Sequence, residues 1–77
     1  MTIDKDTAIE RATESIRVID PHALFVSANE TDKLREFKGR RGWRIYFHID
    51  DKDFGPYDRP IEVDGETGEA KVVEILL

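Results

Sequence analysis

Two segments constrain the fold of this chain most. Residues 43–50 alternate strictly between large apolar and polar side chains, and residues 59–69 end in a glycine-containing turn. Alternation places every second side chain on the same face of a strand. One face of the first segment therefore has Trp43, Ile45, Phe47 and Ile49, and the other has Arg44, Tyr46 and His48. A strand that is apolar on one face only is typical of an antiparallel sheet that is covered on that side.

A helix over residues 5–19 is predicted to cover that apolar face. Asp4 is a suitable N-cap, and Pro21 ends the helix because the residue before a proline avoids the α region. Apolar residues recur at helical spacing and form one stripe, which consists of Ile9, Ala12, Ile16 and Ile19. We expect this stripe to pack on the apolar face of the sheet.

The rest of the chain predicts a meander. Further strands are expected at 23–28, 60–64 and 70–76, with a turn at 39–42 and a loop at 51–58. Residues 30–37 fit either a continued strand or a short helix capped by Asn29, and Pro60 is expected to open its strand. The prediction is a single α+β domain over residues 1–77, with one N-terminal helix packed on a three- to four-stranded antiparallel sheet.

The last predicted strand has apolar residues on both faces. Val73 and Ile75 should face one side of the sheet, and Val72 and Leu76 the other. Either both faces of this strand are partly covered by the protein itself, or a partner covers one of them.

The composition excludes several classes of protein. Seventy-seven residues allow one core, and the absence of cysteine excludes disulfides, thiolate metal sites and a thiol nucleophile. No apolar run approaches the roughly 20 residues that span a membrane, so no membrane association is expected. The acidic, amphipathic N-terminus differs from a signal peptide, and a cytoplasmic location is the expectation.

Positive charge is concentrated in one segment of an acidic protein. The net charge is −5, yet residues 33–44 contain six basic side chains and one acidic side chain. This segment could bind an anion or nucleic acid, or attract an acidic protein surface. It could also be simply solvated or pair with the protein's own acidic segments at 50–53 or 64–69, and we favour this last interpretation. The candidate binding residues are Arg40, Arg41, Trp43, Arg44, Tyr46 and His48.

The sequence predicts no catalytic site, cofactor or metal site, and hence no enzyme. His22 and His48 are the only imidazoles, and their spacing is not that of metal ligands. The acidic residues Asp50, Asp51 and Asp53 lack the following glycine and distal glutamate of an EF-hand loop. No nucleophile elbow, phosphate-binding loop or Ser-His-Asp order is present.

The segment 60–69, PIEVDGETGE, is similar to two families when it is combined with Gly42–Phe47 upstream. It resembles PepSY-like domains, whose last hairpin has a similar V-D-x-x-T-G turn. It also resembles small bacterial immunity proteins of the immunity-protein-35 type, which pair an equivalent of Gly42-Trp43 with a later threonine-glycine turn. Both resemblances imply a binding or inhibitory module that has a protein partner or associates with itself. An anion or nucleic-acid binder acting through residues 33–44 is the alternative.

Overall fold

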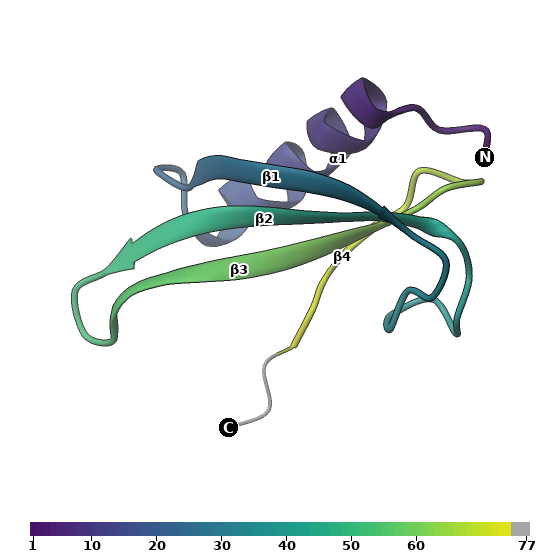
Figure 1. Ribbon diagram of the computed structural model, residues 1–77. Helices are drawn as coiled ribbons and strands as arrows, with labels where there is room; N and C mark the ends of the chain where they lie inside the picture. Colours follow the sequence, from purple (N-terminus) through teal and green to yellow (C-terminus); the bar gives the residue numbers. More distant parts are fainter. Residues whose placement is uncertain (75–77) are drawn as a thin grey trace.

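A computed structural model describes residues 1–74 as one helix lying against one face of a four-stranded antiparallel sheet (Figure 1). The elements are α1 (Lys5–Ile19), β1 (Leu24–Thr31), β2 (Gly42–Asp51), β3 (Gly55–Asp64) and β4 (Ala70–Val72). The strand order is β1-β2-β3-β4, so each strand pairs with its neighbour in the sequence. The predicted α+β fold, a helix followed by a meander, is confirmed.

Local sequence signals account for α1. The Asp4 side chain accepts a hydrogen bond from the backbone N–H of Thr7 at 2.8 Å, as expected of an N-cap. The fully buried helix residues form one row at a spacing of four and are Ala8, Ala12 and Ile16. Ile19 was expected in this stripe but is 46% exposed, because it lies one position off the row, in the last turn of the helix.

The core lies between this helix row and one face of the sheet. The sheet contributes Ile45, Phe47 and Ile49 from β2 and Ile61 and Val63 from β3. The alternation predicted for residues 43–50 is therefore observed, since every second residue of β2 faces α1. Burying these aliphatic and aromatic side chains is the main favourable term in the stability of the fold.

The start of β3 differs from the prediction. Residues 51–58 were expected to form a loop and Pro60 to open the strand, but β3 begins at Gly55 and Pro60 lies opposite Tyr46 in its middle. The carbonyl of Pro60 accepts a hydrogen bond from the N–H of Val73, on the side away from β2. The proline nitrogen points to the same side, so no β2–β3 hydrogen bond is lost.

Neither a strand nor a helix spans residues 30–37. Glu30 and Thr31 end β1, and a connection over residues 32–41 leads to β2. Within it, the N–H of Gly39 donates to the carbonyl of Leu34, and Gly39 has a φ of 78°. Leu34 and Phe37 are buried, so the connection is anchored by apolar side chains that neither alternative had placed in the core.

Gly42 belongs to β2 rather than to the turn predicted at 39–42. A Cβ atom at this position would meet the carbonyl oxygen of Val63 and lie 2.6 Å from Cδ1 of Leu34. Glycine is therefore required here by the close approach of two neighbouring segments and not by a positive φ.

The last strand is shorter than predicted. β4 comprises Ala70–Val72; Val72 packs against the core on the α1 side, and Val73 is also buried. Both faces of this segment are thus covered in part by the protein itself. Ile75 and Leu76 lie outside the described residues. Over residues 1–74, no helix has the length and apolar character needed to cross a membrane.

Candidate binding surface

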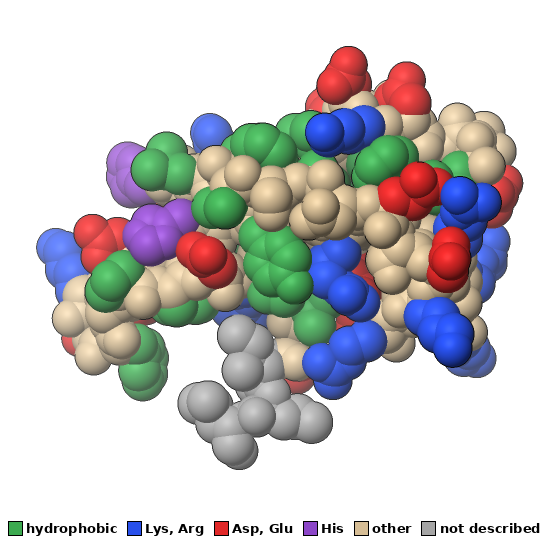
Figure 2. Space-filling view, in the orientation of Figure 1, with side chains coloured by type: hydrophobic (Ala, Val, Ile, Leu, Met, Phe, Trp, Pro, Cys, Tyr) green, Lys and Arg blue, Asp and Glu red, His purple; other side chains and the backbone are tan. Residues whose placement is uncertain are grey.

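The sheet face turned away from α1, called the outer face below, bears the polar residues predicted on β2. In Figure 1 the sheet lies in front of α1, so Figure 2 looks onto this face. Arg44, Tyr46 and His48 alternate with the core residues and belong to the outer face. Trp43, the remaining aromatic candidate, packs on the α1 side instead, and its indole N–H donates to the carbonyl of Ile3 at 3.0 Å. The structure therefore separates Trp43 from the other candidates.

Arg44 is held by a buried carboxylate. Its Nε and Nη2 donate to Oε2 of Glu62 at 3.0 and 2.7 Å, and Oε1 accepts from the backbone N–H of Glu36 at 2.7 Å. The Glu62 side chain is 0% exposed and that of Arg44 is 27% exposed. This pair fastens the 32–41 connection to the sheet, because Glu62 belongs to β3, Arg44 to β2 and Glu36 to the connection.

The hydrogen bonds around Glu62 determine its protonation. Burial raises the pKa of this carboxyl group. The backbone N–H of Glu36, the hydrogen bond from Arg44, the backbone N–H of Arg35 and the charge of Arg44 outweigh burial, so the pKa of Glu62 lies below the ordinary value for glutamate. Glu62 therefore stays ionised at neutral pH.

The other two candidate arginines also pair with carboxylates of the same chain. Arg40 Nε lies 3.3 Å from Oδ2 of the buried Asp64. Arg41 Nη2 lies 2.6 Å from Oε1 of Glu30, and its Nε lies 3.5 Å from Oδ1 of Asp32. Asp64 lies in one of the acidic segments that the sequence suggested as partners, whereas Glu30, Asp32 and Glu62 were missed. Strand pairing brings Glu30 and Glu62 close to the arginines, since Glu30 lies opposite Trp43 and Glu62 lies opposite Arg44.

His48 is joined to a carboxylate across β2 and β3. Its Nδ1 lies 3.0 Å from Oδ1 of Asp58, and both side chains are about half exposed. A carboxylate on one ring nitrogen orients an imidazole for proton transfer. Asp58 is, however, the only hydrogen-bond partner of His48 in residues 1–74, so no hydroxyl nucleophile is aligned with it. Nor do three His, Asp or Glu side chains of the described segment cluster as metal ligands.

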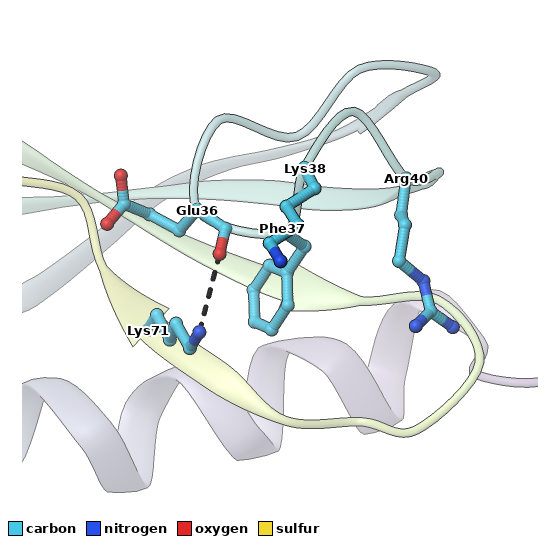
Figure 3. A pocket seen from close by; sticks show the side chains of 5 residues that line it. All are labelled: Glu36, Phe37, Lys38, Arg40 and Lys71. Atoms are coloured by element: carbon cyan, nitrogen blue, oxygen red, sulfur yellow. Dashed lines mark hydrogen bonds between the residues drawn. The ribbon is translucent and has the colours of Figure 1, made fainter.

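A shallow depression of about 190 Å³ lies where the 32–41 connection meets β4. Glu36, Phe37, Lys38, Arg40 and Lys71 line it (Figure 3). The ammonium of Lys71 lies 4.8 Å from the centre of the Phe37 ring and donates to the carbonyl of Glu36 at 3.4 Å. Because Arg40 is paired with Asp64 and Lys71 is engaged with Phe37, an anion bound by either of these two side chains would compete with contacts that already exist.

Three exposed apolar side chains begin β1, and sequence reasoning did not single them out. Leu24 is 66% exposed, and Phe25 and Val26 are each 49% exposed. Three consecutive large apolar residues in a strand cannot all face one core, which is the signal that could have revealed them. A β-bulge separates Phe25 from Ser27, so Val26 has no direct partner on β2.

A comparison of the chain with protein-family models, with curated proteins and with solved structures found no match. The resemblance to PepSY-like domains and immunity-protein-35-type proteins therefore stays a prediction. What the chain does has to be inferred from its surfaces.

Proposed function

We propose that this protein is a non-enzymatic protein-interaction module, of the binding or inhibitory type that PepSY-like and immunity-type proteins exemplify. The outer face around Tyr46 is its proposed contact surface. Cytoplasmic action is part of the proposal and agrees with a chain free of cysteine.

The observation that supports this proposal most is the position of Tyr46. It is half-buried between Ser27 of β1 and Pro60 of β3, near the middle of the sheet. Within residues 1–74 its hydroxyl makes no hydrogen bond, and the side chain combines an apolar ring with a polar tip. A half-buried tyrosine near the middle of a sheet face is the type of residue that anchors protein interfaces.

The neighbours of Tyr46 suit a polar rim. The Arg44–Glu62 pair lies on one side along β2, and the His48–Asp58 pair lies on the other. Interfaces commonly surround an aromatic anchor with solvated polar groups that exclude water from it. A partner should therefore offer an apolar contact for the ring and a hydrogen-bonding group for the hydroxyl.

Nucleic-acid or anion binding through residues 33–44 is less favoured. Arg40, Arg41 and Arg44 are each within ion-pair distance of a carboxylate of the same chain. A phosphate would have to displace these partners, and the net charge of −5 would oppose its approach. Single-strand readers also use exposed aromatic platforms beside their basic groups, whereas Trp43 packs on the α1 side.

Photo-crosslinking in cells of the source organism tests the proposal. A benzophenone amino acid at position 46 should give an adduct with another protein, and the same adduct should form when a lysate is irradiated at about 1 M salt, where surface charge is screened within about 3 Å. The matched control is the same amino acid at Phe54, which is highly exposed on the turn between β2 and β3.

Equal adduct patterns at positions 46 and 54 would contradict the outer face as the contact surface. Adducts that consist of nucleic acid would favour the alternative function. Tyr46→Phe refines the test, since loss of the hydroxyl alone should weaken the partner complex while the ring contact is kept.

A further inference from the structure

The two edges of the sheet differ in their free backbone groups. The edge opposite β1 consists of β4, which is only three residues long, and of residues 55–60 of β3, which pair with no described strand besides β2 apart from the hydrogen bond from Val73 to Pro60. The carbonyl of Pro60 points away from β2. Because the direction of the backbone groups alternates along a strand, those of Pro56, Asp58 and Pro60 all point away from β2, toward this edge. Two of these three are prolines, which have no N–H to donate. This edge is therefore protected against strand addition.

The edge formed by β1 lacks this protection. By the same alternation the backbone groups of Tyr46 point toward β1, so Ser27 and Asn29 bond to β2. The N–H and C=O groups of Ala28 and Glu30 then point outward, and no backbone group of residues 1–74 is bonded to them. β1 contains no proline, and its one charged residue, Glu30, is paired with Arg41.

We propose that β1 is a dimerisation edge, along which a second copy of this chain adds antiparallel to form a continuous eight-stranded sheet. Among residues 1–74, β1 is the longer unprotected edge, whereas the opposite edge is short at β4 and contains prolines in β3. Two copies joined through the same edge make a closed two-fold pair rather than a fibre. The dimer is independent of what binds around Tyr46, and it would place two outer faces side by side.

A two-fold axis at Ala28 gives a register in which the outward backbone groups of the two β1 strands can pair. Ala28 then lies opposite its equivalent, so that outward-pointing backbone groups meet, and Ser27 lies opposite Asn29 of the second copy. The two Glu30 residues are four positions apart along the strands, which is roughly 14 Å, so like charges do not face each other. The exposed Leu24, Phe25 and Val26 begin the same strand and would lie beside the second copy.

The first test is sedimentation of the purified full chain over an about hundredfold range of concentration. A monomer–dimer equilibrium is expected, and added salt should strengthen it because each copy has a net charge of −5. A chain that stays monomeric throughout, or that forms open-ended polymers, would overturn the proposal.

A matched pair of variants at Glu30 tests the edge itself. Glu30→Pro removes an outward N–H without removing a β1–β2 hydrogen bond, and Glu30→Ala removes the same ion pair with Arg41 but keeps the N–H. Glu30→Pro should raise the dimer dissociation constant about tenfold or more, while Glu30→Ala should change it only about twofold. Equal effects of the two substitutions would count against strand addition at β1.

Cysteine variants keep the proposal testable if Glu30→Pro fails to fold. The chain has no cysteine, so Ser27→Cys and Asn29→Cys introduce the only thiols. Under oxidation, an equal mixture of the two variants should yield a disulfide-linked dimer, whereas each alone should link poorly, because only positions 27 and 29 face each other. Crosslinking that is no better in the mixture would refute the register.

Discussion

The Arg44–Glu62 pair predicts an asymmetry in stability that depends on burial. Arg44→Met leaves the Glu62 carboxylate charged and 0% exposed, with the N–H of Glu36 at 2.7 Å as one remaining donor. Removing one partner from a buried pair costs about 3–5 kcal/mol, and we expect the lower end here because the pair borders solvent through Arg44. This is a large part of the roughly 4–12 kcal/mol expected for a domain of this size.

Replacing the other partner of the pair, Glu62, should lower the free energy of unfolding by less. Glu62→Met leaves Arg44, whose side chain is already 27% exposed and can turn its guanidinium into water. The expected cost is about 1–2 kcal/mol, mainly the lost hydrogen bonds. The double variant, with methionine at both positions, should be more stable than Arg44→Met alone, since no uncompensated charge stays buried.

Urea unfolding at pH 7, followed by far-UV circular dichroism, measures these differences. With a slope of about 1 kcal/mol per molar urea, Arg44→Met should lower the midpoint by about 3 M and Glu62→Met by about 1–2 M. Equal costs for the two single variants, or a double variant less stable than Arg44→Met, would refute the account of Glu62 as a buried charge neutralised by Arg44.

Three further outcomes follow from the structure. Because the pKa of Glu62 is lowered in the folded protein, the ionised carboxylate stabilises the fold above about pH 4.3, and this stabilisation is lost as the pH falls through the lower folded pKa. In acid titrations, the difference in the free energy of unfolding between the wild type and Glu62→Met should therefore become smaller below about pH 4.3. In thermal or urea unfolding, Gly42→Ala should lower the free energy of unfolding by about 1–3 kcal/mol, since the added methyl group meets the backbone of β3. At Gly39 an added methyl group meets nothing within 4 Å, so Gly39→Ala should lower the free energy of unfolding by only about 1 kcal/mol, because of the positive φ. Trp43→Phe removes the indole donor to the carbonyl of Ile3, so the free energy of unfolding should fall by about 1 kcal/mol and hydrogen exchange at the N-terminal residues should become faster. Unchanged exchange rates would show that this hydrogen bond does not hold the N-terminus.

Local sequence signals were sufficient for α1 and β2. The cap at Asp4, the stop at Pro21 and the alternation from Trp43 to Ile49 act within a few residues, so they specify these elements whatever the rest of the chain does. The apolar stripe and the apolar strand face then have one way to be buried together, which fixes the helix-on-sheet arrangement.

Other elements depended on partners distant in the sequence. When only its missing N–H is considered, Pro60 is expected to begin a strand. Its nitrogen points away from β2, however, so β3 continues through Pro60 without losing a hydrogen bond to β2. Residues 32–41 follow no helical or strand period, because Leu34 and Phe37 are buried through a turn anchored on Glu62. Neither result can be derived without the strand register.

The residue types available for binding are evident from the order of the residues, namely a basic segment in an acidic chain and a polar face on residues 43–50. Their contacts depend on how the strands pair. Strand pairing places Glu30 and Glu62 against Arg41 and Arg44, which pairs two of the six basic side chains of residues 33–44, because ion pairs depend on distances that the chain order does not contain. The same pairing leaves β1 open and turns the prolines of β3 outward, since the direction of a backbone N–H is set only when a strand has a neighbour.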